Sequence, residues 1–359
     1  MSQTDENTTK PEKYLQKIGE SVLTKWLEEN YDIGVAKIIA IPKGVIGDSY
    51  VIEDLNGKKY FLKIHLLSKL HIDNPRGLGS TLELTFLVTT QVVRQCQALN
   101  NHHFIENVPY PIKRQDGKLE GEFGEYSVVL MNYIDGNTPE ITKNFVIKIA
   151  TLIARIHQVD KSKVNLPVEP FDLSYANELR KYLLVLEQSL NLNKNRQKLR
   201  DLLLPERLLL NKYIDRLNEL CDKVRNNQNN LVITRGDLIP DNFMSDSSEN
   251  AFIVDWDGAK FTPAERDAWF FMGEFRNDFL KTYKKHNPNA KIDIDLLCFY
   301  MYKRYIEDIV YWANEILYEN LDKTQVEGNL DGIKVCCLEE LQNIEKKVEN
   351  MKSAINDLP

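Results

Sequence analysis

The spacing of apolar residues changes along this chain, and the change limits the folds open to it. Residues 35–67 read as three short strands, with Asn56-Gly57 as a strong hairpin signal between two of them. From residue 144 onward, most apolar runs recur with the period of an amphipathic helix. This order predicts a small antiparallel sheet followed by a mainly helical part.

The same pattern predicts the boundaries. Residues 1–10 are predicted to form a disordered tail. Residues 11–132 are predicted to form an N-terminal lobe that contains the sheet and one helix, from Thr81 to about Leu99. Residues 133–359 predict a mostly helical C-terminal lobe with an inserted β-hairpin, so the expected class is α+β with two lobes. A helical stripe is also expected before the first strand, at Leu15, Ile18, Val22 and Trp26.

Composition excludes several classes of protein. The formal net charge of −7 makes a nucleic-acid backbone a poor partner. No apolar run reaches the length of a membrane span, and the polar start lacks a signal peptide's apolar core. The five cysteines form no CxxC pair, which favours reduced thiols over disulfides or a zinc site. We expect a cytoplasmic protein, monomer or homodimer, that binds neither nucleic acid nor membrane.

Two polar segments interrupt strand-like runs in the second half. In VITRGDLIPDNFM, Asp237 and Asn242 stand five residues apart in a loop, and in AFIVDWDG the apolar run ends on Asp255. A turn followed by a hairpin can bring these oxygen atoms together, and Mg²⁺ prefers such ligands. Asn242 and Asp255 suit the metal, which leaves Asp237 as a base. An Asx-turn with helix capping would explain Asp241 or Asn242 alone, but not the ordered set.

The first half offers candidate phosphate-binding residues. No GxxxxGK[ST] or GxGxxG motif is present. Gly44, Gly47 and Ser49, in PKGVIGDSY, could let backbone N–H groups approach a phosphate, or could form a plain hairpin turn. Lys63 lies among apolar residues of a predicted strand, where a cation needs a partner; a solvent-facing lysine is the alternative.

Together, RGDLIPDNFM and FIVDWD resemble the H-x-D-x-x-x-x-N and D-x-[DE] motifs of the aminoglycoside phosphotransferase and choline kinase superfamily, which is related to protein kinases. VDWDGAKFTPAERDAWFF is most similar to the spectinomycin phosphotransferases. The resemblance implies a bilobal protein-kinase-like fold and a small-molecule kinase. It covers residues 15–320 in order.

The resemblance also implies roles for individual residues. Lys63 would hold the phosphates of ATP or GTP, with Glu83 as its partner, and Asp237 would be the catalytic base. Asn242 and Asp255 would bind Mg²⁺, and Asp267 would support the catalytic loop. The purine-binding hinge would be Met131, Asn132 and Tyr133.

Two positions depart from related motifs. Arg235 stands where the family usually has histidine, which puts the packing of the loop in doubt and would lower the pKa of Asp237. Asp257 stands where protein kinases have the glycine of their DFG motif, which argues against a protein kinase.

A long helix near the C-terminus offers a candidate acceptor site. Carboxylates beside aromatic rings suit a protonated amine, and such a group is formed by Glu307, Asp308, Tyr311 and Trp312. Both acids could instead pair with Lys303 and Arg304 as ordinary surface residues.

The expected activity is Mg²⁺-dependent transfer of the γ-phosphate of ATP or GTP to a hydroxyl of a small cationic molecule. An aminoglycoside or aminocyclitol antibiotic is the favoured class, and the enzyme would then confer resistance. A metabolic kinase for choline or another alcohol is one alternative. A nucleotide-binding pseudokinase with a regulatory role is another, and the intact Lys63, Asp237, Asn242 and Asp255 count against it.

Overall fold

The computed structural model describes residues 14–41, 47–66, 107–189, 192–225 and 230–357. The chain forms two compact units. The N-terminal unit consists of Met1–Glu140, Val159–Pro167 and Asp237–Ala259, and the helical unit of Ile141–Gln158, Val168–Gly236 and Lys260–Pro359. The predicted tail, the predicted helix at residues 81–99 with Glu83, and Gly44 lie outside the described residues.

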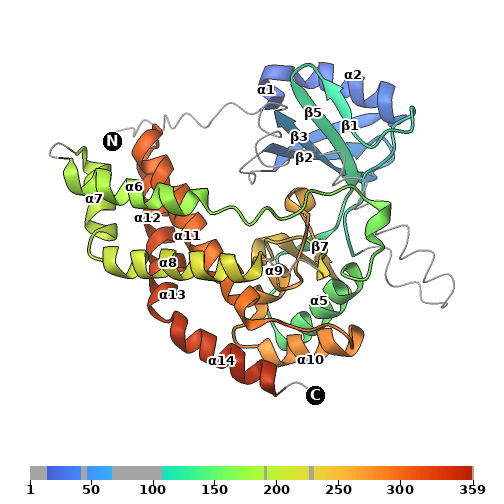
Figure 1. Ribbon diagram of the computed structural model, residues 1–359. Coiled ribbons are helices and arrows are strands. Elements are labelled where there is room, and N and C mark those ends of the chain that lie inside the picture. The colour runs from blue at the N-terminus through green and yellow to red at the C-terminus, as the bar shows by residue number, and fades with distance from the viewer. Residues whose placement is uncertain (1–13, 42–46, 67–106, 190–191, 226–229, 358–359) are drawn as a thin grey trace, which may run out of the picture. The chain divides into compact units, whose positions relative to one another are not determined.

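An antiparallel five-stranded sheet forms the framework of the N-terminal unit, in the order β1-β2-β3-β5-β4 (Figure 1). Its strands are β1 (Val35–Ile41), β2 (Gly47–Asp54), β3 (Lys59–Leu66), β4 (Gly121–Phe123) and β5 (Tyr126–Asn132). The hairpin predicted at Asn56-Gly57 joins β2 to β3. Gly57 has a φ of 79°, and the Asp54 carboxylate accepts the N–H groups of Asn56 and Lys58 at 2.9 and 2.8 Å.

Helices α1 (Tyr14–Ile18) and α2 (Glu20–Tyr31) precede the sheet, and α2 packs on one of its faces (Figure 1). Gly19, with a φ of 86°, interrupts the expected single helix. The buried face of α2 carries Leu23 and Leu27, whereas Val22 is 50% exposed. The predicted stripe was therefore wrong at Val22, because the break at Gly19 rotates the second helix relative to the first.

The side chains of this sheet divide between two faces. The apolar face packs against α2 and contains Tyr50, Ile52, Leu62, Ile64, Val128 and Leu130. Because side chains alternate along a strand, Lys63 and His65 point to the other face of β3. This second face carries the candidate nucleotide-binding residues.

A second, three-stranded sheet in the N-terminal unit has the order β6-β8-β9. It contains the predicted hairpin, and its strands are β6 (Gly136–Asn137), β8 (Phe243–Asp246) and β9 (Ala251–Ile253). The short 3₁₀ turns of this unit are η2 (Lys161–Lys163), η4 (Pro240–Asn242) and η5 (Trp256–Gly258). The turns η4 and η5 flank the hairpin and carry the polar motifs.

The helical unit is built around the 25-residue helix α11 (Ile294–Tyr318), which packs against α6 (Ser174–Gln188) and α8 (Arg207–Val224) (Figure 1). Helix α5 (Lys143–Ile156) packs against α10 (Arg276–His286). The remaining elements are α7 (Lys194–Leu203), α9 (Glu265–Ala268), η6 (Trp269–Phe271), α12 (Lys323–Asp331), the π-helix η7 (Gly332–Leu338), α13 (Glu339–Gln342), α14 (Ile344–Asn356) and the paired strands β7 (Val232–Thr234) and β10 (Lys260–Thr262).

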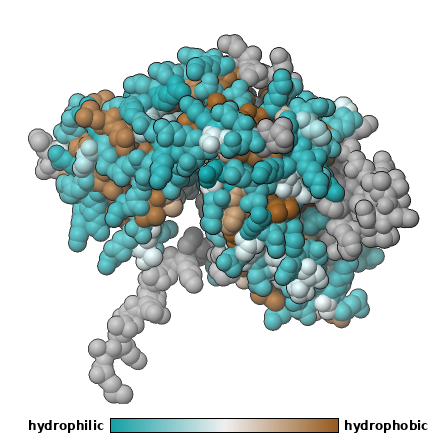
Figure 2. Space-filling view, turned by 90° about the horizontal axis from the view of Figure 1, so that it is seen from below, coloured by the Kyte–Doolittle hydropathy of each residue, from teal (hydrophilic) through white to brown (hydrophobic). Residues whose placement is uncertain are grey.

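The face of the molecule shown in Figure 2 is mainly hydrophilic, with hydrophobic residues in separate groups. None of the helices in the described ranges has the length and hydropathy that a membrane span requires.

Candidate active site

The segment that carries Asp237 is held by the side chain of Asn242. The Asn242 amide nitrogen donates to the Asp237 carbonyl oxygen at 2.8 Å and to its Oδ2 at 3.0 Å. Asn242 is 9% exposed and ends the 3₁₀ turn η4. Since one amide nitrogen makes both bonds, Asn242 fixes the orientation of the Asp237 carboxylate and directs its own Oδ1 away from it.

The β8–β9 hairpin brings Asn242 and Asp255 to the same end. Phe243 pairs with Ile253, and the Asn242 carbonyl accepts the Val254 N–H at 3.0 Å. Asp255 follows directly, in a left-handed conformation with a φ of 60°. Non-glycine residues in this region cost energy and are found preferentially at functional sites. The two residues predicted as Mg²⁺ ligands are therefore neighbours in the structure.

Lys63 on β3 lies between two carboxylates of the same unit. Its Nζ is 2.7 Å from Asp255 Oδ1 and 2.5 Å from Asp257 Oδ2. Burial alone would lower the pKa of Lys63, but the charges of Asp257 and Asp255 outweigh it and the pKa is raised. Lys63 therefore remains an ammonium ion, and Asp257 contacts it directly.

His65 is a residue of this face that the sequence analysis missed. Its side chain is 1% exposed, and its Nε2 lies 3.6 Å from Asp257 Oδ2. Burial lowers the pKa of His65 to about 4, although the nearby Asp257 charge opposes the effect. The imidazole is thus neutral at pH 7. Its position two residues after Lys63 on a strand was the available signal.

Strand β2 places two further predicted residues beside Lys63 and His65. Ser49 pairs with Lys63 and Gly47 pairs with His65 across the antiparallel ladder. Ser49 is 7% exposed. Residues directly opposite on antiparallel strands share a face, so Ser49 lies on the same face as Lys63.

The predicted hinge lies at the end of β5. The Asn132 N–H donates to the Tyr110 carbonyl at 3.1 Å, and Asn132 Oδ1 accepts the Tyr110 N–H at 2.7 Å. The backbone N–H and the side-chain oxygen of Asn132 thus both form hydrogen bonds with Tyr110, in the preceding loop. Met131 pairs with Phe61 of β3, and Lys59 Nζ lies 5.6 Å from the centre of the Tyr133 ring.

In the helical unit, Asp267 holds the backbone that leads to Asp237. Its carboxylate accepts the Gly236 N–H at 2.6 Å and the Arg235 N–H at 3.1 Å. Asp267 is 1% exposed and Arg235 is 3% exposed. Gly236 has a φ of 81°, and a Cβ there would collide with the Arg266 guanidinium. The segment therefore needs glycine at 236 and an acceptor at 267.

The donor set suits a Mg²⁺ ion shared with a nucleotide. Asp255 offers a half-exposed carboxylate, and Asn242 an amide oxygen at the same end of the hairpin. Within the described ranges, no group of three or more His, Cys, Asp or Glu side chains could hold a metal ion alone. Mg²⁺ in kinases takes only one or two carboxylates, and phosphates and water complete its shell. The protein groups fit that arrangement.

The structure separates the candidate acceptor residues on α11 into two groups. Glu307 pairs with Lys303, whose Nζ lies 5.3 Å from the centre of the Tyr175 ring. Asp308 pairs with Arg304 at 2.8 Å. Trp312 packs against Gly332 of η7, and Tyr311 is 49% exposed. Both acids thus form the i,i+4 pairs that a helix surface would give.

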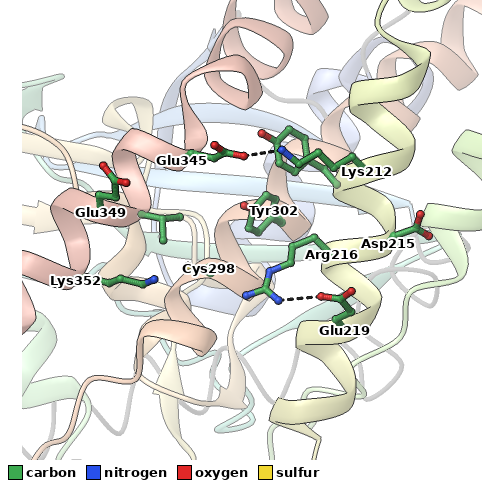
Figure 3. A pocket seen from close by; sticks show the side chains of 11 residues that line it. Lys212, Asp215, Arg216, Glu219, Cys298, Tyr302, Glu345, Glu349 and Lys352 are labelled. Carbon is green, nitrogen blue, oxygen red and sulfur yellow. Dashed lines mark hydrogen bonds and ion pairs between the residues drawn. The ribbon is translucent and has the colours of Figure 1, made fainter.

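A cavity of about 600 Å³ lies elsewhere in the helical unit, between α8, α11 and α14 (Figure 3). The ion pairs Lys212–Glu345 and Arg216–Glu219 lie along it, at 2.5 and 2.9 Å (Figure 3). None of the predicted site residues lines it. This cavity is therefore separate from the groups described above.

Comparisons with known proteins show the family of this chain. A family model described as phosphotransferase enzyme family matches residues 37–290, more than half of the chain. Among curated proteins, no similar sequence is found.

Solved structures with similar folds include a spectinomycin phosphotransferase in complex with ADP and spectinomycin. It has 16% identity and a TM-score of 0.71, over 93% of this chain and 98% of that chain. An aminoglycoside phosphotransferase from Alicyclobacillus acidocaldarius has 12% identity and a TM-score of 0.60, over 91% and 95%. An amicoumacin kinase in complex with AMP-PNP, Ca²⁺ and Ami has 11% identity and a TM-score of 0.53, over 89% and 95%.

These findings confirm the α+β, protein-kinase-like fold and the resemblance drawn from the motifs. The chain therefore belongs to the phosphotransferase enzyme family and is a small-molecule kinase.

Proposed function

We propose that this enzyme transfers the γ-phosphate of ATP or GTP, with Mg²⁺, to a hydroxyl of a small cationic molecule. The favoured acceptor is an aminoglycoside or aminocyclitol antibiotic, so that the enzyme confers resistance. The observation that carries the proposal is the convergence of Lys63, Asp255 and Asp257 in the same unit as the Asn242–Asp237 pair. This is the set of groups that phosphoryl transfer needs.

Each of these residues would have a separate role in the transfer. The acceptor hydroxyl oxygen attacks the γ-phosphorus, the bond from that phosphorus to the β–γ bridging oxygen breaks, and Asp237 takes the hydroxyl proton. Asn242 keeps the Asp237 carboxylate in position through its amide nitrogen. Lys63, which is an ammonium ion, would hold the phosphates. A Mg²⁺ ion held by Asn242 and Asp255 would neutralise charge on the phosphates.

For the acceptor, the Glu307 side of α11 is the better candidate. Glu307 is 39% exposed, and its partner Lys303 lies over the ring of Tyr175. The Tyr175 hydroxyl is buried and has no hydrogen-bond partner within the described part of the chain. Burial, and then the charge of Glu307, raises the pKa of Tyr175. The Glu307 carboxylate could accept hydrogen bonds from the ammonium group of an amino alcohol.

Similar enzymes support the substrate class. One solved relative holds ADP and spectinomycin, which is an aminocyclitol, and another is an aminoglycoside phosphotransferase. The identities of 16% and 12% make these relatives a guide to which acceptors to test first.

The test is a panel of acceptors incubated with γ-labelled ATP or GTP and Mg²⁺. The panel contains spectinomycin, several aminoglycosides, choline and a reaction without acceptor, each with wild type and Asp237→Asn. We expect label in an aminocyclitol or aminoglycoside with wild type only. Label in choline alone would replace the antibiotic assignment by a metabolic one. Nucleotide binding without transfer to any acceptor or to water would overturn the proposed activity.

A further inference from the structure

His65 is a buried residue of the sheet face that carries Lys63, and its imidazole makes no hydrogen bond. Neither ring nitrogen has a partner in the part of the chain that the structure describes. Directly opposite on β5 lies Ser127, which is also buried and whose hydroxyl likewise has no partner there. Buried polar groups in folded proteins are nearly always hydrogen-bonded, so this pair requires an explanation.

The Asp257 carboxylate lies just beyond hydrogen-bond distance of His65. Its Oδ2 is 3.6 Å from His65 Nε2 but 2.5 Å from Lys63 Nζ, so the lysine holds this oxygen. The imidazole is neutral and carries one hydrogen, because burial lowers the pKa of His65 to about 4. An ionised carboxylate can only accept hydrogen bonds. The ring can therefore bond to Asp257 only as the Nε2–H tautomer, in which Nδ1 is an acceptor and the Ser127 hydroxyl a possible donor.

The two carboxylates around Lys63 differ in what would happen to them when a nucleotide binds. Lys63 Nζ lies 2.7 Å from Asp255 and 2.5 Å from Asp257. A Mg²⁺ ion would neutralise Asp255. Asp257 would keep its charge beside Lys63 and repel the phosphates that Lys63 has to hold. Phosphate binding is therefore favoured if Asp257 has another donor to turn to.

We propose that His65 is this donor, and thus a positioning residue for nucleotide binding. When Lys63 bonds to the phosphates, the Asp257 carboxylate turns from Lys63 Nζ to His65 Nε2–H and closes the gap of 3.6 Å. The buried imidazole then has a partner, and Lys63 has one carboxylate fewer beside it. The inference rests on the proposed function in taking Lys63 as the residue that holds the phosphates.

Two amide variants at position 65 separate the donor from the rest of the side chain. The amide nitrogen of Gln can take the place of Nε2, whereas that of Asn can take only the place of Nδ1. Calorimetry with a non-hydrolysable ATP analogue and Mg²⁺ should give a Kd within about threefold of wild type for His65→Gln. His65→Asn and the apolar His65→Leu should each raise the Kd about tenfold. Equal Kd values for the Gln and Asn variants would overturn the proposal.

The Asp257→Asn background is the control for a merely structural role of His65. Without the charge at position 257, Lys63 has no second carboxylate to release. His65→Leu should therefore change the Kd by less than about twofold in this background, against about tenfold in the wild-type background. An equal loss of affinity in both backgrounds would show that His65 only supports the sheet, and would overturn the proposal.

Lys63→Met tests the movement of Asp257 with no nucleotide present. The carboxylate then loses its cation, and we expect it to turn to His65. In spectra of ¹⁵N-labelled histidine, the Nε2–H proton of His65 should move downfield relative to wild type, and His65→Gln identifies the signal by removing it. An unchanged proton shift would overturn the proposal, whatever the nucleotide affinity.

Failure of the proposed function would give a different result. If wild type bound no nucleotide, or if Lys63→Met left the Kd unchanged, Lys63 would not hold the phosphates. The proton shift in Lys63→Met would still decide whether His65 can take the Asp257 carboxylate from Lys63.

Discussion

At the scale of single residues, Asp237 carries the sharpest expectation. Asn242 orients the Asp237 carboxylate, and we propose that this carboxylate accepts the proton of the acceptor hydroxyl. Asp237→Asn should lower kcat roughly 10²–10⁴-fold, because a general base is lost. Nucleotide affinity, measured by calorimetry, should stay nearly unchanged. Asp241→Asn is the matched control, an exposed aspartate in the same turn. Equal activity of the two variants would remove Asp237 from the mechanism.

Gly236 is the second residue with a strict local requirement. Gly236→Ala combines a left-handed backbone, which costs roughly 1–2 kcal/mol for a side chain, with a collision against the Arg266 guanidinium. Gly117→Ala isolates the first contribution, since Gly117 has a φ of 83° and a Cβ there meets nothing within 4 Å. We expect Gly236→Ala to lower the free energy of unfolding clearly more than Gly117→Ala in urea titrations. Equal losses would mean that Arg266 moves aside easily.

At the scale of elements, the two acidic residues on α11 should behave differently. Lys303, the ion-pair partner of Glu307, lies over the ring of Tyr175. The charge of Asp308 instead acts on Tyr305 and Cys337, on the η7 side of the helix. Glu307→Gln should therefore raise the KM of a confirmed acceptor at least tenfold with little change for ATP, since a partly buried charge pair is worth about 2–5 kcal/mol when one side is removed.

Asp308→Asn, the matched control, should leave both KM values within about twofold, because the Asp308 charge acts on the η7 side of α11 and not on Tyr175. If both variants had an acceptor KM close to wild type, the amine would bind elsewhere. If Asp308→Asn alone raised it, the acceptor would lie on the η7 side of α11.

Elements set by neighbouring residues could be predicted from the sequence. The hairpin at Asn56-Gly57, the strand with Lys63 and the β8–β9 hairpin all depend on turn chemistry and on alternation over a few residues. The helix register before β1 could not be predicted, because Gly19 breaks the helix and no local pattern shows by how much the next one turns.

For the site, the sequence predicted the residues that motifs carry, and the structure places Lys63, Asp255 and Asp257 in contact. Asp267 was predicted from the motif as a support of the loop, but its contact with His157 could not be predicted. The two residues are separated by 110 positions, and only the folding of the helical unit brings them together. A lone histidine on an apolar helix gives no sign of its partner.

At the scale of the whole molecule, the chain crosses between its two units at Gly236–Asp237 and again at Ala259–Lys260. The segment with Asp237 is thus anchored on both sides of a crossing. Asp267 of the helical unit holds Gly236, and Asn242 of the N-terminal unit holds Asp237. A substitution that destabilises either unit is therefore expected to lower activity, because it would loosen this short segment.

The pH dependence of stability follows from Glu265 in the helical unit. Burial raises the pKa of Glu265 from 4.5 to about 7, although the Asp293 N–H, at 2.7 Å, opposes the effect. A raised carboxyl pKa stabilises the fold fully below about pH 4.5, and this contribution is lost as the pH rises through 7. The shift corresponds to roughly 3 kcal/mol.

Glu265→Gln should remove that pH dependence, because its amide stays neutral and its oxygen can still accept the Asp293 N–H. Urea titrations at pH 5 and pH 8 should show the variant gaining roughly 3 kcal/mol relative to wild type between the two. Glu349→Gln, at an exposed position, changes the formal charge equally and should show no such gain. A parallel course for Glu265→Gln and wild type would mean that Glu265 ionises at its ordinary pKa.

Nucleotide binding provides the last prediction, since a ligand that binds only the folded chain stabilises it. At about 100 times Kd, MgATP should add about 2.7 kcal/mol and raise the Tm by roughly 4 °C. Lys63 would hold phosphates directly, whereas Asp255 would act through the metal. Lys63→Ala should therefore lose most of the ATP-induced shift with or without Mg²⁺. Asp255→Ala should lose only the part that Mg²⁺ adds. Lys37→Ala, at an exposed position on β1, should behave as wild type. A full Mg²⁺ increment in Asp255→Ala would show that Asp255 is not a metal ligand, and the metal would then have to be held by other groups.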